Sequence, residues 1–194
     1  MRQLYAFILA IVGFVFRLIF RIDAKGAENI PAEGAVLLCA NHVHMFDPVV
    51  IAMNSRREIR FMGKAEAFEW PVLGSLFRAM GGFPVKRGGA DISAVRTSLK
   101  YLKEGQIVGI FPEGTRSKTG ELGKAQHGVM MLADSANVVM VPAGIMGPYK
   151  LLGRIKLRIG EPVMSRDLLP PGVEYSREAA ANALMQRIEA LRRG

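Results

Sequence analysis

The sequence contains little of several residue types on which many binding sites depend. Among 194 residues there are one cysteine, one tryptophan and three histidines. A single cysteine, Cys39, excludes an internal disulfide framework and fits a reducing compartment. Cys39 with His42, His44 and His127 gives no recognisable set of metal ligands, so we expect no metal. No repeat, linker or low-complexity stretch divides the chain, and its length suits one α/β domain rather than two.

Acidic residues are also scarce relative to basic ones. The chain has 17 Asp and Glu against 26 Lys and Arg, which gives a net charge of +9. Such a balance indicates an anionic partner, either nucleic acid, an anionic membrane surface or a phosphorylated substrate. Half of the residues are hydrophobic and the mean hydropathy is +0.20, which favours the membrane. Aromatic residues do not alternate with the basic ones and no nucleic-acid-binding module is recognisable, so we expect no nucleic acid.

The longest apolar run lies at the N-terminus, over residues 4–16, and continues after Arg17. It predicts a helix to about residue 22 that is hydrophobic on nearly all sides, with Arg17 and Arg21 on one face. No small-residue cleavage site follows, so we expect no removed signal peptide. We predict that residues 1–24 form a membrane-anchoring helix, which spans the inner membrane or lies on its cytoplasmic face. The alternative is an apolar helix packed on the domain.

Strand and helix signals alternate over residues 25–194, which we assign to a single domain. The apolar patterns predict strands at residues 35–40, 59–62, 83–85, 106–111, 138–143 and 155–159. Helices are expected at residues 49–53, 70–80, 91–103, 126–135 and 177–191. Residues 23–34 are turn-rich. This alternation predicts an α/β fold, with a mixed, mostly parallel sheet covered by helices.

The strand-to-helix turn after the first strand carries a histidine and an aspartate. Residues 40–48 read ANHVHMFDP, which places His42 and Asp47 five positions apart. An imidazole takes up a proton near neutral pH, and a carboxylate on its other nitrogen fixes the tautomer and stabilises the cation. The alternative is structural. Asp47 would then cap a helix that begins at Pro48, and His42 would be a hydrogen-bonded loop residue.

Two further strand-end loops carry basic residues. One brings Arg87, and the other brings Glu113, Gly114 and Arg116. Ligands of open α/β sheets bind where strand ends and loops converge, so these loops could share one crevice. An arginine fork suits phosphate oxygens, glycine allows close approach of the backbone, and Glu113 could orient Arg116 or accept a bond from a substrate hydroxyl. Together they indicate a site for a phosphorylated alcohol, with Lys64 as a weaker phosphate ligand.

The order of four motifs resembles that of a known family. NHVHMFD, GGFPVKR, FPEGTRS and VPAGI, over about residues 36–145, resemble the glycerolipid acyltransferases, specifically the 1-acylglycerol-3-phosphate O-acyltransferase (lysophosphatidic acid acyltransferase) family. The resemblance implies that His42 and Asp47 are the catalytic pair. The substrate-binding residues expected from the motifs and the neighbouring loops are Lys64, Arg87, Glu113, Gly114, Thr115 and Arg116.

The resemblance also implies a reaction. An acyl group would pass from acyl-CoA or acyl carrier protein to the free hydroxyl of lysophosphatidic acid, giving phosphatidic acid for phospholipid biosynthesis, with His42 as general base. The thioester is a co-substrate, and no cofactor is expected. No serine or cysteine elbow is present, so no acyl-enzyme is needed. Backbone N–H groups near Gly114 or Asn41 are candidate oxyanion donors.

Other possibilities remain at this stage. His44 lies three residues before Asp47 and could compete with His42 for the carboxylate. The same fold could acylate another lysolipid, or serve as a non-catalytic membrane module that binds phospholipid. The expected partners are lysophosphatidic acid, the thioester donor and an anionic membrane surface.

Overall fold

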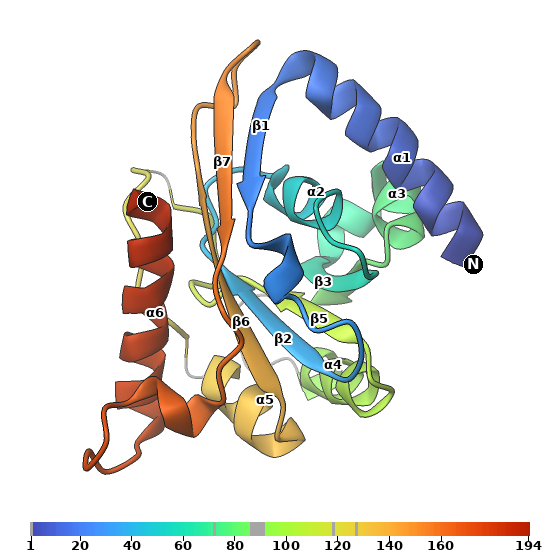
Figure 1. The fold of residues 1–194 in the computed structure, drawn as a ribbon. Helices are drawn as coiled ribbons and strands as arrows, with labels where there is room; N and C mark the ends of the chain where they lie inside the picture. Colours follow the sequence, from blue (N-terminus) through green and yellow to red (C-terminus); the bar gives the residue numbers. More distant parts are fainter. Residues whose placement is uncertain (1, 72, 86–91, 118, 127) are drawn as a thin grey trace.

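The computed structural model describes residues 2–71, 73–85, 92–117, 119–126 and 128–194, which form one sheet with helices on both faces (Figure 1). Its strands are β1 (Arg21–Lys25), β2 (Val36–Ala40), β3 (Ile59–Lys64), β4 (Phe83–Val85), β5 (Ile107–Ile110), β6 (Val139–Met146) and β7 (Arg154–Ile159). The α-helices are α1 (Arg2–Ile19), α2 (Asp47–Ala52), α3 (Leu73–Ala79), α4 (Ile92–Lys103), α5 (Gly128–Ala136) and α6 (Arg177–Arg193).

The strand order places the functional loops at one edge. Across the sheet the order is β1-β7-β6-β2-β5-β3-β4. The five neighbours from β6 to β4 are parallel, whereas β7 is antiparallel to β6 and parallel to β1. The predicted mixed, mostly parallel sheet is therefore confirmed. Because β2, β3, β5 and β6 point the same way, the loops that follow them leave from the same edge.

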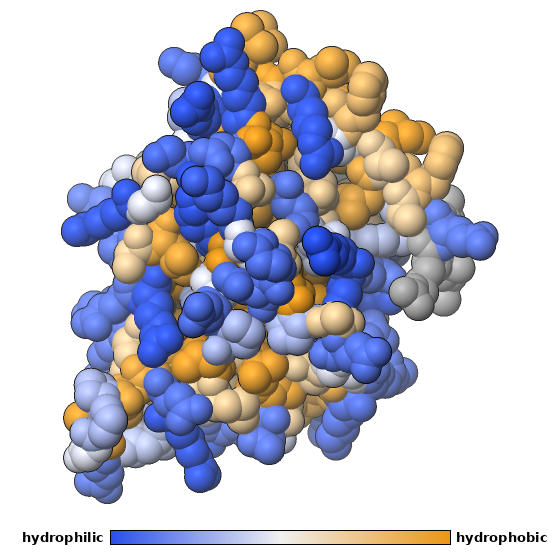
Figure 2. Space-filling view, in the orientation of Figure 1, coloured by the Kyte–Doolittle hydropathy of each residue, from blue (hydrophilic) through white to orange (hydrophobic). Residues whose placement is uncertain are grey.

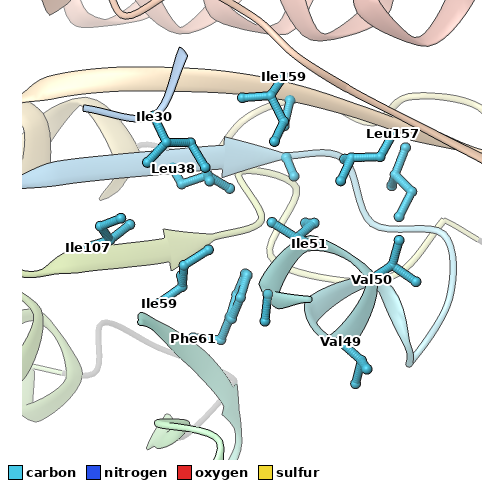
Figure 3. Close-up of a cluster of buried hydrophobic side chains, with 14 of the residues drawn as sticks. Ile30, Leu38, Val49, Val50, Ile51, Ile59, Phe61, Ile107, Leu157 and Ile159 are labelled. Atoms are coloured by element: carbon cyan, nitrogen blue, oxygen red, sulfur yellow. The ribbon is translucent and has the colours of Figure 1, made fainter. Parts of the chain in front are cut away.

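Strand β2 lies at the centre and is buried on both sides. Leu38 faces the cluster formed with α1 and α2, which Figure 3 shows with Val50 and Ile51 near the strand. Leu37 and Cys39 point to the opposite side, into the cluster formed with α4, α5 and α6. Successive side chains of a strand alternate between faces, so a strand covered on both sides needs a continuous apolar run. That requirement explains why residues 36–40 carried a strong signal.

The edge strand β1 was missed by the sequence pattern, which predicted a helix to residue 22 and turns from residue 23. The strand pairs with β7, with Asp23 opposite Lys156. Arg158 fixes the pair through a bond of 3.0 Å from its Nη2 to Asp23 Oδ2, and this bond lowers the pKa of Asp23. Charged residues and partial exposure leave no apolar periodicity in such a strand. Arg21 belongs to β1, so its predicted place on a helical face with Arg17 is wrong.

Helix α1 packs on the domain through one face. Tyr5, Phe16 and Phe20 are buried in the first cluster, and Figure 1 shows α1 lying over α2 and α3. The other face is exposed and apolar, and comprises Phe7, Ile11, Phe14, Val15, Leu18 and Ile19. Within the described residues, none of the helices has the length and hydrophobicity needed to cross a membrane. Packing of α1 on the domain is thus observed, and its membrane-anchoring role stays a prediction.

Two of the predicted helices differ in detail from the structure. Trp70, with which one predicted helix begins, precedes α3 and is half exposed. On α4 the buried face comprises Ala94, Ser98 and Leu102, whereas Ile92 is exposed. Small side chains at two of these positions let the helix lie close to the sheet, which turns the larger apolar residues toward its margin. Residue 91, with which the predicted helix begins, lies outside the described residues.

Candidate active site

The central motif occupies the turn between β2 and α2. His42 lies two residues beyond β2, and Asp47 is the first residue of α2. The N-cap position of this helix belongs to Phe46, whose side chain makes no capping bond. The alternative in which Asp47 caps the helix is therefore wrong, and its carboxylate points back into the preceding loop.

His42 and Asp47 form a buried pair. His42 Nδ1 lies 2.8 Å from Asp47 Oδ2, with the histidine side chain 10% exposed and the carboxylate fully buried. The same oxygen accepts bonds of 2.7 Å from the backbone N–H groups of Val43 and His44. Because an ionised carboxylate can only accept, Nδ1 carries the proton and Nε2 keeps its lone pair. The arrangement can therefore take up a proton at Nε2 and stabilise the resulting cation through Asp47.

Aromatic side chains fix the plane of the imidazole. The His42 ring stacks on Phe111 with centroids 4.0 Å apart and planes 14° apart. Phe111, which follows β5, lies in turn 5.8 Å from the ring of Phe61 at 17°. This stack on one side and the bond to Asp47 at one end restrict the ring to a single orientation.

The loop after β5 holds the main chain of His42. The N–H of His42 donates to Glu113 Oε1 at 3.0 Å, and the N–H of Ser117 donates to the carbonyl of His42 at 2.8 Å. The second oxygen of Glu113 accepts the N–H of Gly123 at 3.1 Å. Glu113 is buried, and its two oxygens bind backbone N–H groups. It thus positions the motif, and its two recorded oxygen contacts are with backbone N–H groups rather than with Arg116, while its predicted contact with a substrate hydroxyl stays a prediction.

Gly114 is required by the shape of the same loop. Its φ of +70° lies in the left-handed region, and its N–H donates to the carbonyl of Phe111 at 2.9 Å. A Cβ at this position would lie 3.0 Å from Cγ of Gln126. Glycine is the residue that adopts this conformation at little cost. Gly114 therefore shapes the turn, and its own N–H is already bonded.

The backbone donors predicted for an oxyanion are largely occupied. The N–H groups of residues 42–44 bind Glu113 and Asp47, and the N–H of Gly114 is used in its turn. Asn41 also has a structural part, since its side chain exchanges two bonds with the backbone of Ile145, of 2.9 and 2.7 Å. These bonds join the end of β2 to β6.

Basic residues lie along the same edge of the sheet. Arg116 and Thr115 are exposed, and no ion pair of Arg116 is recorded among the residues that the structure describes. Lys64, at the end of β3, is exposed and pairs with Glu66 at 3.2 Å. Arg87 lies outside the described residues. Arg116 is thus the predicted phosphate ligand that the structure places on the loop holding His42.

His44 does not compete for Asp47 through its imidazole. Its backbone N–H donates to Asp47, whereas its Nδ1 accepts the N–H of Phe46 at 3.4 Å. Burial lowers the pKa of His44, the charge of Asp47 partly opposes this shift, and the charge of Arg116 adds to it. The lowered pKa favours the neutral ring, which stacks on Tyr149 at 4.1 Å and 14°.

Tyr149 is a site residue that the motifs did not reveal. Its hydroxyl donates to Asp47 Oδ1 at 2.5 Å, although the two residues are 102 positions apart. The tyrosine follows β6, which is parallel to β2, so both residues lie at the same sheet edge. Burial and the neighbouring carboxylate raise the pKa of Tyr149. The signal that could have identified it is the strand order, which places the end of β6 beside the end of β2. Within the described ranges, no three His, Cys, Asp or Glu residues gather as metal ligands.

Comparison with known proteins identifies similar sequences and a similar fold. The acyltransferase family model matches residues 21–146. A 1-acyl-sn-glycerol-3-phosphate acyltransferase of Bacillus subtilis is 32% identical over 176 residues, which cover 88% of this chain and 87% of that protein. A chloroplastic 1-acyl-sn-glycerol-3-phosphate acyltransferase of Arabidopsis thaliana is 29% identical over 69% of this chain, and the match spans 38% of the plant protein.

A solved structure has the same fold. The crystal structure of the 1-acyl-sn-glycerophosphate (LPA) acyltransferase from Thermotoga maritima superposes with a TM-score of 0.73 at 24% sequence identity. The match covers 96% of this chain and 79% of the other. It therefore supports the arrangement of strands and helices described above.

Proposed function

The chain belongs to the acyltransferase family, and on this premise we propose that it acylates the free hydroxyl of 1-acylglycerol-3-phosphate from a thioester, giving phosphatidic acid. The observation that carries the proposal is the buried His42–Asp47 pair, with Nε2 of His42 available as a base. Relatives named as 1-acyl-sn-glycerol-3-phosphate acyltransferases support this choice of acceptor. The product supplies phospholipid biosynthesis.

The chemistry follows from the pair. Nε2 of His42 removes the proton of the acceptor hydroxyl as its oxygen attacks the thioester carbonyl. Asp47 stabilises the imidazolium that forms. The tetrahedral intermediate then collapses, the carbon–sulfur bond breaks, and the thiolate of CoA or acyl carrier protein takes the proton from His42. Cys39 is fully buried and burial raises the pKa of its thiol, so it is not a nucleophile for an acyl-enzyme.

The acceptor phosphate would bind the basic residues at the sheet edge. Arg116 is exposed, has no recorded ion-pair partner among the described residues, and lies on the loop that holds His42. A guanidinium offers two parallel donors to phosphate oxygens. Arg87, Thr115 and Lys64 complete the proposed set. This placement puts the charged end of the acceptor beside the base.

The acceptor is a lipid, and the outer surface of α1 suits a membrane. Its exposed apolar face is continued by Leu151 and Leu152, because the N–H of Leu152 donates to the carbonyl of Ile19 at 2.7 Å. Figure 2 shows apolar atoms along α1 and at the neighbouring β6–β7 loop. We propose that this surface lies on anionic lipid, an association that the net charge of +9 favours. A single cysteine suits the cytoplasmic face of the membrane.

The test is acyl transfer by purified protein in mixed lipid and detergent. Labelled lysophosphatidic acid is the acceptor, and acyl-CoA and acyl carrier protein thioester are the donors. We expect wild type to form phosphatidic acid and His42→Ala to be about 10²- to 10⁴-fold slower. Cys39→Ala removes the one thiol and should retain the activity.

Four results would contradict the proposal. Turnover that survives in His42→Ala would move the base to another residue, and loss of turnover in Cys39→Ala with the fold intact would indicate an acyl-enzyme. Folded wild type that acylates a phosphate-free lysolipid, but not lysophosphatidic acid, would change the acceptor. Lipid binding without turnover from either donor would indicate a non-catalytic module that binds phospholipid.

A further inference from the structure

The carboxylate of Asp47 is held by two different parts of the chain. Its Oδ2 accepts three bonds from residues 42–44, all within five positions of Asp47. The donor recorded for Oδ1 among the described residues is the hydroxyl of Tyr149, from the loop between β6 and β7. The local motif therefore orients one oxygen, and the distant tyrosine orients the other.

The loop that carries Tyr149 is itself fixed. The N–H of Leu152 donates to Ile19 at the end of α1, and the N–H of Arg21 donates to the carbonyl of Gly153 at 2.9 Å. The ring of Tyr149 lies between two others: it stacks on His44 and meets Phe20 edge-on at 5.7 Å and 76°. Contacts on both sides of the ring leave the hydroxyl one direction, toward Asp47.

Tyr149 can act only as a donor in this bond. Its pKa is raised by burial and by the carboxylate, which favours the protonated hydroxyl. An ionised carboxylate accepts and does not donate. The bond consequently persists while His42 gains and loses its proton.

We propose that Tyr149 is a positioning residue for acyl transfer, which fixes Oδ1 of Asp47 so that Oδ2 stays directed at Nδ1 of His42. The inference rests on the proposed function and adds a residue from outside its motifs. His44 then serves as the ring on which Tyr149 stacks, which gives the second histidine of the motif a purpose other than proton transfer.

The bond also controls how strongly Asp47 favours protonated His42. A hydroxyl that donates to Oδ1 withdraws negative charge from the carboxylate. Without it, the carboxylate would carry more negative charge but would be held less firmly toward Nδ1, so the balance between neutral and protonated His42 would change. The charged and titratable groups around the pair are Glu113, bound to the N–H of His42, the ring of His44, and Arg116. The direct effect of the substitution is confined to the hydroxyl, since phenylalanine retains both ring contacts.

The experiment compares Tyr149→Phe with Tyr175→Phe in the full chain. Tyr175 donates its hydroxyl to Asp134 at 2.7 Å, so the control removes the same kind of bond from another part of the molecule. We expect Tyr149→Phe to lower kcat about tenfold, the size of one hydrogen bond to a charged group, with KM for both substrates within about twofold. The acid limb of kcat/KM should lie at a different pH from that of wild type. Tyr175→Phe should keep wild-type kinetics at every pH.

A second measurement separates this inference from the proposed function. Titration of the ¹⁵N-labelled imidazoles by NMR needs no substrate. The midpoint of the His42 titration should differ between Tyr149→Phe and wild type. A wild type that makes no phosphatidic acid would overturn the proposed reaction. The titration would still test whether the bond from Tyr149 to Asp47 affects His42. The inference is overturned by an unchanged His42 titration, by wild-type kcat in Tyr149→Phe, or by a lower kcat with an unmoved acid limb.

Discussion

Asp47 and Asp134 are both bound by a tyrosine hydroxyl, yet they occupy different regions of the molecule. Asp47 lies at the carboxyl edge of the sheet and accepts from Tyr149 at 2.5 Å. Asp134, on α5, accepts from Tyr175 at 2.7 Å and from Ser165 Oγ at 2.8 Å. Each carboxylate also binds one basic side chain, His42 in the first case and Arg177 in the second.

The basic partner decides what each aspartate can do. Arg177 Nε lies 2.8 Å from Asp134, and a guanidinium stays charged at every working pH, so this pair cannot exchange a proton. Imidazole gains and loses its proton near neutrality. Asp134 is 20% exposed and joins α5 to the segment before α6, whereas Asp47 is fully buried beside a base with a free nitrogen. The basic partner therefore decides the role of a carboxylate that accepts from tyrosine. With arginine the carboxylate is structural, and with histidine it can be part of an active site.

The largest expected effect is that of a substitution at Asp47, which tests the comparison with Asp134. Asp47→Asn keeps the shape of the side chain but cannot balance an imidazolium, and its amide group would face N–H donors. We expect kcat to fall about 10²- to 10⁴-fold, as for loss of the base itself. Asp134→Asn makes the same chemical change and should retain wild-type kcat. Steady-state kinetics of both variants, with circular dichroism to verify folding, check this; a loss below tenfold in Asp47→Asn contradicts the assigned pair.

The next effect tests the loop that holds His42. Glu113→Gln places an amide where two backbone N–H groups now bind, so one of them loses its acceptor. We expect kcat to fall about 10- to 100-fold through displacement of the imidazole, since small misplacements of a catalytic group are costly. Ser165→Ala removes one bond from the Asp134 cluster and is the control, with unchanged kcat. Equal kcat in wild type and Glu113→Gln would show that the bonds of Glu113 to the backbone are not needed to position His42.

A smaller effect distinguishes Arg116, for which no ion pair is recorded within the described part of the chain, from Arg177, which is paired with Asp134. Arg116→Ala should raise KM for the phosphorylated acceptor about tenfold, the size of one charge-assisted contact, with a smaller change in kcat. Arg177→Ala removes a guanidinium that is already bound to Asp134 and should leave KM unchanged. The check is KM measured for lysophosphatidic acid and for a phosphate-free lysolipid. If Arg116→Ala raises KM equally for both acceptors, the arginine does not bind phosphate.

The sequence predicted the parts of the site that depend on local pattern. Strand β2, the pair His42 and Asp47, and the shared sheet edge follow from apolar runs, from residue spacing and from the topology of parallel sheets. The resemblance to a family named the same pair. Each of these signals lies within a few residues of the feature that it predicts.

The long-range hydrogen bonds of the site and the edge strand β1 could not be predicted from such local patterns. The partners Tyr149 and Asp47 are 102 residues apart, and Glu113 is 71 residues from His42. The bonds of Glu113 to the backbone N–H groups of His42 and Gly123 also join distant parts of the chain, so its motif alone did not indicate them. Strand β1 was missed because pairing with β7, rather than an apolar pattern, makes it a strand.

The smallest expected effect concerns stability. Asp134→Asn weakens the bonds to Ser165, Tyr175 and Arg177, and we expect the free energy of unfolding at pH 7 to fall by about 1–2 kcal/mol. For a chain of this length that is a loss of about 2–8 °C in Tm. Thermal unfolding followed by circular dichroism measures it. A wild-type Tm in Asp134→Asn would mean that the cluster contributes nothing to the fold.

The pH dependence of that difference separates the charge of Asp134 from its shape. Burial alone would raise the pKa of Asp134, but bonds from Arg177, Tyr175 and Ser165 lower it below its usual range. A carboxylate with a lowered pKa in the folded state stabilises the fold above its unfolded pKa, about 3.9, and loses this contribution as pH falls through the folded value. The wild type should therefore be more stable than Asp134→Asn at pH 7, and the two should converge as the pH falls below the lowered pKa of Asp134 in the folded state, where the carboxyl is neutral. Denaturant unfolding at several pH values between these limits measures the difference. The difference in the free energy of unfolding could instead be as large at the lowest pH as at pH 7. The shape of the Asp134 side chain, rather than its charge, would then stabilise this cluster, and the contrast with Asp47 would no longer rest on ionisation.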